Sequence, residues 1–219
     1  MPKLSSLLFV LLMPSAWAAS EKKLPLPAGS HCVAYKVVKT MFIVSSDEVV
    51  GKNCDVSAQI LPEVGGLYHI EVNIPIRSFA SGSEDRDKDV VKILQGDKRP
   101  EMTFKSKAKT VDGWRELFAK GDFPIEGELM IGSKSFPLTL QTKYKKASEQ
   151  DEVDGTARVK FKDFDIDPPR AGGGLVAKAK PEFDLYFHLL SQRILGADSI
   201  RLGAKDTEKN TDKKDKKDE

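Results

Sequence analysis

The chain has 219 residues, and its 35 Lys and Arg nearly balance its 33 Asp and Glu. This length predicts one domain or at most two small ones. The balance of charge excludes a strongly basic nucleic-acid binder and a strongly acidic solvating protein. Charge is concentrated at the end of the chain, because residues 204–219 contain six Lys and six acidic residues. Such a segment has almost nothing to bury, so we expect a disordered charged tail.

The first residues have the pattern of an export signal. Lys3 precedes an apolar run at residues 7–13, and Pro14 and the small-residue stretch 16–19 follow it. This order predicts a secretory signal peptide over residues 1–18, and the run is far shorter than the ~20 apolar residues of a membrane span. We therefore expect a periplasmic or secreted protein. Its parts would be the signal peptide, an N-terminal extension at 19–30, a domain at 31–203 and the tail at 204–219.

The chain has two cysteines, Cys32 and Cys54. Export would place them in an oxidising compartment, where a single disulfide is expected. The residue pattern argues the other way, because Cys32 is out of phase with Val33 whereas Cys54 is in phase with Val56. A bulge or an irregular strand end would then be needed to bring the thiols together. A metal site has less support, since no His or Cys stands at ligand spacing from them.

Alternation of apolar and polar residues dominates the rest of the chain. It predicts eight strands, at residues 32–39, 54–61, 68–77, 102–109, 123–131, 136–145, 157–162 and 182–189. A further strand around residues 41–50 is left open. Strands that bury one face suit an antiparallel sheet with a solvated side. Residues 132–134 (Gly-Ser-Lys) are the clearest hairpin turn between two of these strands.

One segment departs from the alternation. Residues 83–96 begin with acidic residues, continue with apolar ones and end at Gly96. This order predicts a short amphipathic helix across one end or edge of the sheet. An all-β fold with these strands is either a sandwich or a closed eight-stranded barrel. Such a barrel is either packed solid or holds one small ligand, and the pattern does not decide between these alternatives.

Several motifs occur together in one order. Residues 78–82 read Ser-Phe-Ala-Ser-Gly, residues 86–87 read Arg-Asp, and residues 99–106 read Arg-Pro-Glu-Met-Thr-Phe-Lys-Ser. With the later stretches 127–132, 136–140, 163–164 and 183–189, they resemble the signature of the YceI-like family of secreted lipocalin-like proteins. The chain departs from the family pattern at Cys32, Phe161 and Asp165. Residues 40–55 align poorly, and the charged tail has no counterpart.

The resemblance implies an eight-stranded antiparallel lipocalin-like barrel with one short amphipathic helix near its mouth. It also implies a bound polyisoprenoid such as an isoprenoid quinone, with no other cofactor required. The lumen would be lined by the inward apolar residues of the strands. These are Tyr35, Ile70, Val72, Ile74, Phe79, Met102, Phe104, Leu129, Ile131, Phe136, Leu138, Leu140, Val159, Phe161, Phe183, Leu185 and Phe187.

The residues do not favour an enzyme. His31, His69 and His188 are the only histidines, and we expect His69 and His188 to be solvated on outward strand faces. No nucleophile motif, zinc motif or phosphate loop is present. The aspartates at 163, 165 and 167 precede two prolines and lack the terminal Glu of a calcium loop, so a turn is expected.

Three strands carry a basic outer face, formed by Lys105, Lys107, Lys109, Lys143, Lys145, Lys146, Arg158, Lys160 and Lys162. We expect an ordinary exterior in which these cations pair with acids on neighbouring strands. The alternative is docking to anionic membrane headgroups. The sequence is compatible with a homodimer and does not show one. The competing function is a secreted, ligand-free adaptor whose barrel is packed solid.

Overall fold

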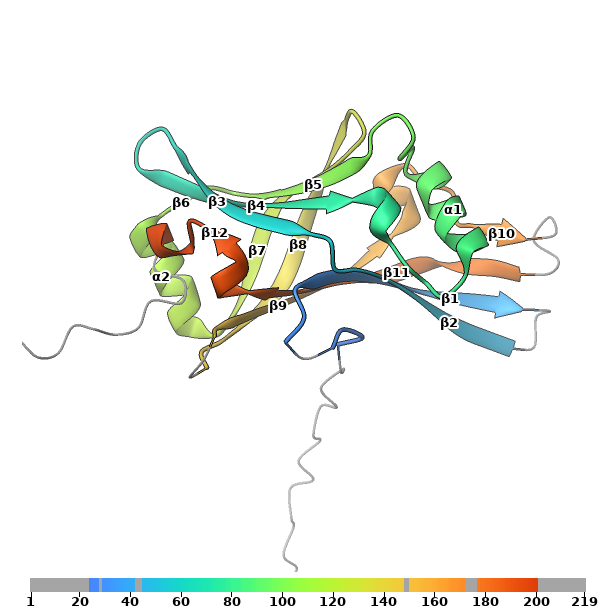
Figure 1. The fold of residues 1–219 in the computed structure, drawn as a ribbon, viewed down its shortest axis with the longest axis horizontal. Coiled ribbons are helices and arrows are strands. Elements are labelled where there is room, and N and C mark those ends of the chain that lie inside the picture. Colours follow the sequence, from blue (N-terminus) through green and yellow to red (C-terminus); the bar gives the residue numbers. More distant parts are fainter. Residues whose placement is uncertain (1–23, 28, 42–44, 148–149, 172–176, 201–219) are drawn as a thin grey trace, which may run out of the picture.

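A computed structural model describes residues 24–27, 29–41, 45–147, 150–171 and 177–200. The predicted signal peptide and charged tail lie outside the described residues. Within these residues the strands form one twelve-stranded sheet (Figure 1). The strands are β1 (Cys32–Met41), β2 (Ser45–Asn53), β3 (Ser57–Glu63), β4 (Leu67–Pro75), β5 (Glu101–Ser106), β6 (Lys109–Thr110), β7 (Asp122–Ile131), β8 (Lys134–Lys145), β9 (Glu152–Lys160), β10 (Arg170–Ala171), β11 (Ala177–Leu190) and β12 (Ile194–Leu195).

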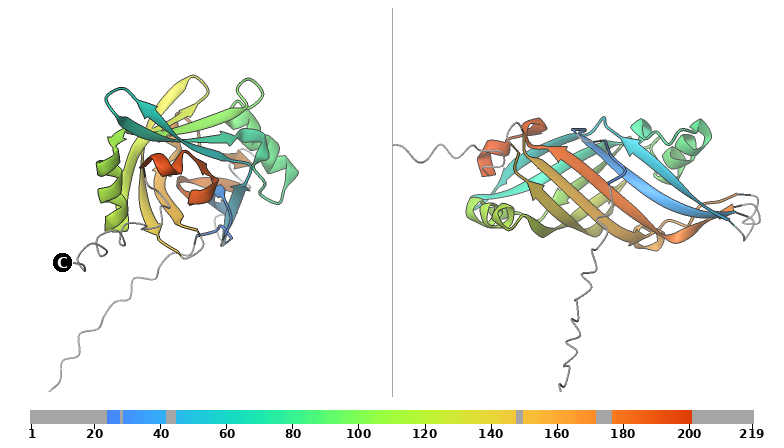
Figure 2. Two further views of the ribbon diagram at one scale, coloured as in Figure 1. Left: turned by 60° about the vertical axis from the view of Figure 1, so that its left-hand side comes forward. Right: turned by 90° about the horizontal axis from the view of Figure 1, so that it is seen from below.

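The sheet curls into a half-barrel (Figure 2). Its order is β12-β3-β4-β5-β7-β8-β9-β11-β1-β2, with β6 beside β4 and β10 beside β11. The long strands pair antiparallel, and β12 runs parallel to β3. In the described residues no ladder joins β2 to β3, so the predicted closed eight-stranded barrel is wrong. The predominantly β fold and its antiparallel pairing are confirmed.

The seam between β2 and β3 is filled by another part of the chain. After the 3₁₀ helix η1 (Ile76–Ser78), Ala80 exchanges two backbone hydrogen bonds with Lys52 of β2, at 2.8 and 2.9 Å. Asn53 donates its side-chain amide to the carbonyl of Pro75 at 2.7 Å. These contacts occupy the edge of β2 at Lys52 and Asn53, the end of the strand from which the chain continues to β3.

The disulfide lies at this seam. Cys32 and Cys54 are bonded, with their Cα atoms 4.1 Å apart. Cys54 belongs to the short connection between β2 and β3, not to β3 itself. The phase argument against the bond fails because it placed Cys54 on a regular strand with Val56.

Inward and outward faces follow the alternation closely. On β8, for example, Phe136, Leu138 and Leu140 are buried and the residues between them are exposed. The hairpin predicted at residues 132–134 joins β7 to β8, with Gly132 at a positive φ of 65°. The inward rows of the long strands form one main hydrophobic cluster. The open question around residues 41–50 is resolved by β2, which begins at Ser45.

Two α-helices lie at opposite ends of the half-barrel (Figure 1). The first, α1 (Glu84–Ile93), is the predicted amphipathic helix. The second, α2 (Val111–Lys120), was missed and makes the expectation of a single helix wrong. It buries Trp114 and Phe118 and packs beside the 3₁₀ helix η5 (Ala197–Ile200). None of the helices in the described residues is both long and apolar enough to cross a membrane.

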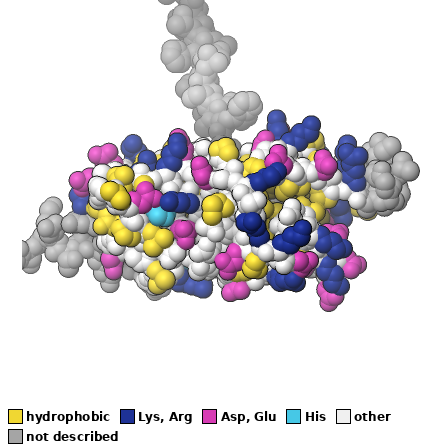
Figure 3. Space-filling model, turned by 90° about the horizontal axis from the view of Figure 1, so that it is seen from above, with side chains coloured by type: hydrophobic (Ala, Val, Ile, Leu, Met, Phe, Trp, Pro, Cys, Tyr) yellow, Lys and Arg dark blue, Asp and Glu magenta, His cyan; other side chains and the backbone are white. Residues whose placement is uncertain are grey.

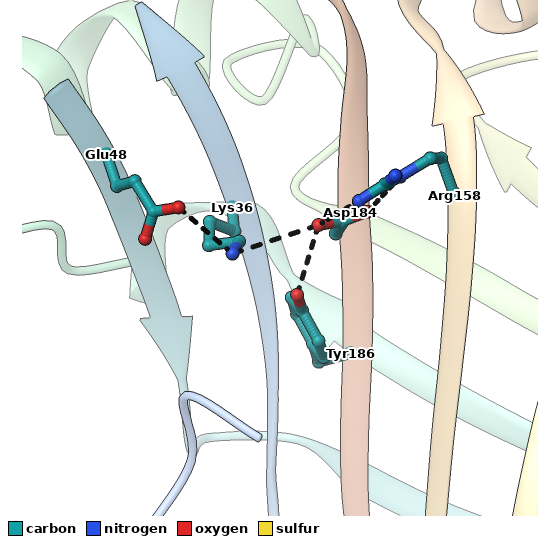
Figure 4. Close-up of polar contacts among 5 residues, drawn as sticks. All are labelled: Lys36, Glu48, Arg158, Asp184 and Tyr186. Atoms are coloured by element: carbon teal, nitrogen blue, oxygen red, sulfur yellow. Dashed lines mark hydrogen bonds and ion pairs between the residues drawn. The ribbon is translucent and has the colours of Figure 1, made fainter. Parts of the chain in front are cut away.

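Ion pairs link neighbouring strands on the outer face. Figure 4 shows Asp184 of β11, which accepts two hydrogen bonds from Arg158 of β9 at 2.7 and 3.2 Å. Lys36 of β1 lies between Asp184 and Glu48 of β2. Tyr186 donates its hydroxyl to Asp184, and burial together with that carboxylate raises the pKa of Tyr186 to about 12. The expected pairing of outer cations with cross-strand acids is confirmed for this cation, Arg158.

Two histidines differ from expectation. His69 and His188 are only 5 % and 4 % exposed, so the prediction that they are solvated is wrong. The reason is that their acidic neighbours bind the rings. His69 lies 2.9 Å from Glu63, and Nδ1 of His188 shares a hydrogen bond with the buried carboxylate of Asp154. These contacts replace water on the outer face.

Candidate ligand-binding cavity

The half-barrel surrounds a cavity of about 470 Å³. This volume lies within the roughly 300–1,000 Å³ usual for small-molecule sites. Its lining is predominantly apolar and comes from the inward rows of the strands. Fifteen of the residues predicted for the lumen line it, namely Tyr35, Ile70, Val72, Ile74, Phe79, Met102, Phe104, Leu129, Ile131, Leu138, Leu140, Phe161, Phe183, Leu185 and Phe187. On the face in Figure 3, hydrophobic side chains in the right half lie between Lys and Arg side chains.

Two predicted lumen residues are not part of this lining. Phe136 is buried against Phe164, with ring centroids 5.5 Å apart, and Val159 packs at the margin of the core. The rings of Phe161, Phe164 and Phe183 form a further aromatic group, in which Phe161 and Phe183 lie 4.5 Å apart. Phe136 therefore contributes to a packed aromatic layer instead of the cavity wall.

Other wall residues could not be reached from strand alternation. Helix α1 contributes Val90, Ile93 and Leu94, and α2 contributes Phe118. The connection after β9 contributes Phe164 and Ile166. The amphipathic pattern at residues 83–96 could have indicated these α1 residues, because the apolar face of such a helix is expected to pack against the interior of the protein.

Glycines on neighbouring strands leave room for aromatic rings along the wall. A Cβ atom at Gly51 would lie 2.3 Å from the ring of Tyr35, its direct cross-strand partner. A Cβ atom at Gly155 would lie 1.9 Å from the ring of Phe187, again the direct partner. Real Cβ contacts are essentially never this short, so a side chain at either position would have to displace the ring of its partner. The rings consequently lie over the sheet and do not extend fully into the cavity.

Five charged residues line the otherwise apolar wall, namely Lys39, Arg86, Asp89, Arg170 and Lys178. Arg86 belongs to a hydrogen-bonded cluster with Ser81 and Asp87. Asp87 of α1 accepts hydrogen bonds from the amide and the hydroxyl of Ser81, at 2.9 and 2.6 Å. Arg86 donates from Nε to the Ser81 hydroxyl at 3.2 Å and from Nη2 to the Ser81 carbonyl at 2.9 Å. Burial raises the pKa of Tyr35 and the charge of Asp87 adds to the increase, while Arg86 and a hydrogen bond with Ser81 oppose it. Ser81 thus holds the start of α1 close to Tyr35.

Other chemistry has little support in the described residues. They contain no group of three or more His, Cys, Asp or Glu placed to hold a metal ion. His31 is 2 % exposed and accepts a hydrogen bond from the amide of Leu190 at 3.1 Å. Burial, with the charges of Arg193 and His188, lowers the pKa of His31 to about 4. This places a neutral, structural histidine beside the end of β11.

The fold and the cavity define a single-sheet β protein with an apolar internal chamber. The chain belongs to the YceI-like family, because the model of the YceI-like domain matches residues 27–189. A search of the curated proteins finds no match to the chain.

One solved structure supports the fold, and two others are similar to a smaller degree. The crystal structure of BcnA from Burkholderia cenocepacia is similar with a TM-score of 0.51 at 19 % identity, covering 71 % of this chain and 95 % of BcnA. A Campylobacter jejuni YceI protein matches with a TM-score of 0.47 at 19 % identity, over 64 % and 82 % of the two chains. A polyisoprenoid binding domain from Saccharophagus degradans gives 0.45 at 11 % identity, over 72 % and 92 %.

Proposed function

We propose that the protein is an exported binding protein that holds an elongated apolar ligand in its cavity, for transport or storage. The observation that supports this most is the cavity of about 470 Å³ with its largely apolar wall. A polyisoprenoid or isoprenoid quinone is the ligand that the family resemblance implies. Export rests on the signal-peptide pattern of residues 1–18.

Burial of apolar surface would supply most of the affinity. Each Å² of apolar surface removed from water contributes about 25 cal/mol. A long hydrocarbon chain therefore needs few polar contacts, which accounts for a site without a sharp sequence motif. The competing function, a ligand-free adaptor with a solid core, requires the same apolar residues to pack against one another. A chamber of about 470 Å³ disfavours it, because a solid core leaves few voids larger than a water molecule.

The first test is direct identification of the ligand. We expect organic extraction of protein purified from its native host, followed by mass spectrometry, to release a stoichiometric apolar lipid. A clean extract from such protein would contradict the proposal and favour the adaptor.

A pair of variants localises the ligand. Leu138 lines the cavity, whereas Thr139, the next residue on β8, is exposed on the opposite face. We expect Leu138→Arg to abolish lipid retention and Thr139→Arg to leave it unchanged. Since a buried arginine can also unfold the protein, Val72→Phe provides a second variant that occupies cavity space with an apolar side chain. Equal lipid retention in Val72→Phe, Leu138→Arg and the wild type would place the ligand elsewhere.

A further inference from the structure

Helix α1 turns one face toward the cavity. Arg86, Val90 and Ile93 follow one another at helical spacing, and all three line the chamber. The last two are apolar and match most of the wall. Asp89 of the same helix also lines the chamber and pairs with Lys92 at 3.6 Å. Arg86 is a cation that borders a predominantly apolar space, where a charged group needs partners.

The protein uses only part of the hydrogen-bonding capacity of Arg86. Nε and Nη2 donate to the hydroxyl and carbonyl of Ser81. Within the described residues Nη1 has no hydrogen-bond partner. A guanidinium carries five N–H donors in a fixed planar arrangement, so donors remain for a further acceptor.

A second donor approaches from the other side of the cavity wall. Tyr35 belongs to the inward row of β1 and lines the chamber. Its ring lies over Gly51 and 5.5 Å from the ring of Phe79. Phe79 stands two residues before Ser81, and Ser81 accepts the hydrogen bonds of Arg86, so Tyr35 and Arg86 border the same part of the wall.

Four other charged residues line the chamber. Asp89 pairs with Lys92, Lys39 pairs with Asp47, and Arg170 and Lys178 come from β10 and β11. In the cluster around Ser81 the charge is balanced, because Ser81 joins one cation, Arg86, to one anion, Asp87. An anionic head group would therefore meet a neutral cluster, with the carboxylate of Asp87 nearby. A neutral oxygen acceptor would receive hydrogen bonds from the guanidinium and the phenol without bringing a second negative charge into a place of low dielectric.

We propose that Arg86 and Tyr35 form a head-group subsite that binds the neutral oxygen of an amphiphilic ligand, a carbonyl or hydroxyl, while its hydrocarbon chain occupies the apolar cavity. This inference rests on the proposed function. It assigns the polar end of the ligand to the α1 side of the chamber and gives the Arg-Asp pair a role beyond fastening the helix.

Three probes with the same branched C20 skeleton test the subsite: phytane without a head group, phytol with a hydroxyl, and phytanic acid with a carboxylate. Binding to the full mature protein is measured by displacement of the neutral fluorophore N-phenyl-1-naphthylamine. We expect phytol to bind about 10-fold more tightly than phytane, as expected for a buried hydrogen bond to a charged group. Phytanate should bind no more tightly than phytol, including at low ionic strength.

Two variants remove the donors. Tyr35→Phe deletes only the hydroxyl, and Arg86→Met keeps a side chain of similar length without charge. We expect both to retain phytane binding and to lose most of the preference for phytol. Tyr68→Phe and Arg77→Met make the same chemical changes at residues that do not line the cavity, and should keep the preference.

The outcomes separate this inference from the proposed function. If phytane and phytol bind equally to the wild type, or if the two donor variants keep the preference, the subsite is refuted while apolar binding stands. Tighter binding of phytanate than phytol would refute the neutral head group. If none of the three probes displaces the fluorophore from the wild type, the proposed function itself fails.

Discussion

The two ends of the half-barrel are closed in different ways. At one end, α2 buries Trp114, which has no exposed surface and donates its indole N–H to the carbonyl of Tyr68 at 2.9 Å. Phe118 of the same helix contacts the rings of Phe123 and Tyr144. At the other end, α1 has no buried residue, and Ile93 is 37 % exposed.

We infer from this difference that the α2 end contributes mainly to the stability of the fold and the α1 end to access to the cavity. The α2 end resembles an ordinary protein core, in which aromatic rings pack against each other and against the strands. The α1 end has an apolar helix face over a chamber, fastened through the Ser81 contacts. Segments with few buried contacts open at lower free energy than the core. We therefore expect a ligand to enter and leave beside α1.

The largest effect is expected from removing the anchor of the α2 end. Trp114→Ala should lower the free energy of unfolding by about 3–5 kcal/mol, because it leaves a cavity in a fully packed site. Val90→Ala on α1 removes a half-buried side chain that faces the chamber, and should cost no more than about 1 kcal/mol. Urea unfolding, followed by far-ultraviolet circular dichroism so that the signal does not depend on Trp114, measures the free energy of unfolding of both variants. Equal losses of unfolding free energy in the two variants would contradict the inference that the α2 end is packed more tightly than the α1 end.

The two wall glycines provide a second comparison. Gly155→Ala places a methyl group against the ring of Phe187, and Gly51→Ala places one against Tyr35. Phe187 directly precedes the three buried residues that end β11, so we expect its ring to have less freedom to move aside, and overpacking should cost about 1–3 kcal/mol. Tyr35 borders the loosely covered α1 end, and we expect a smaller loss there. Thermal unfolding of the two variants, with Thr156→Ala as the control on β9, would show equal losses of stability if the two ends were equally rigid.

Much of the sheet could be predicted because burial of one face leaves a period of two in the sequence. The rows of β4, β7 and β8 and the hairpin at Gly132 follow directly from it. Alternation identifies the face of a residue but says nothing about whether the ends of a sheet meet. The contacts of Asn53 and Ala80 at the seam between β2 and β3 are tertiary, so closure could not be derived.

Helix α2 was missed although it carries a local signal. Thr110 caps it by accepting a hydrogen bond from the amide of Gly113 at 3.1 Å, and Trp114 and Phe118 are four residues apart. Gly113 inside the first turn weakens the helical pattern. Fifteen predicted strand and loop residues line the cavity, whereas Phe136 and Val159 do not, and strand residues such as Val33, Ile125 and Leu189 line it without having been predicted. The wall residues from α1 and from the connection after β9 were missed because they face the chamber only through tertiary packing.

The smallest effect concerns acid and the α2 end. Since burial lowers the pKa of His31 to about 4 from its ordinary 6.5, the unfolded chain takes up a proton in this range before the folded chain does. Stability should therefore decrease as pH falls from 6.5 toward 4, with a contribution from His31 of about 1 kcal/mol between pH 7 and pH 5.5. His31→Asn keeps an acceptor for the amide of Leu190 and cannot titrate. Urea unfolding at the two pH values should show a smaller acid loss in this variant than in the wild type, and an identical loss would mean that His31 is protonated without cost in the folded protein. Because His31 lies beside the end of β11, lower protection factors of the amides there at pH 5.5 than at pH 7, with those in α1 unchanged, would show that acid makes the stability of the two ends more alike.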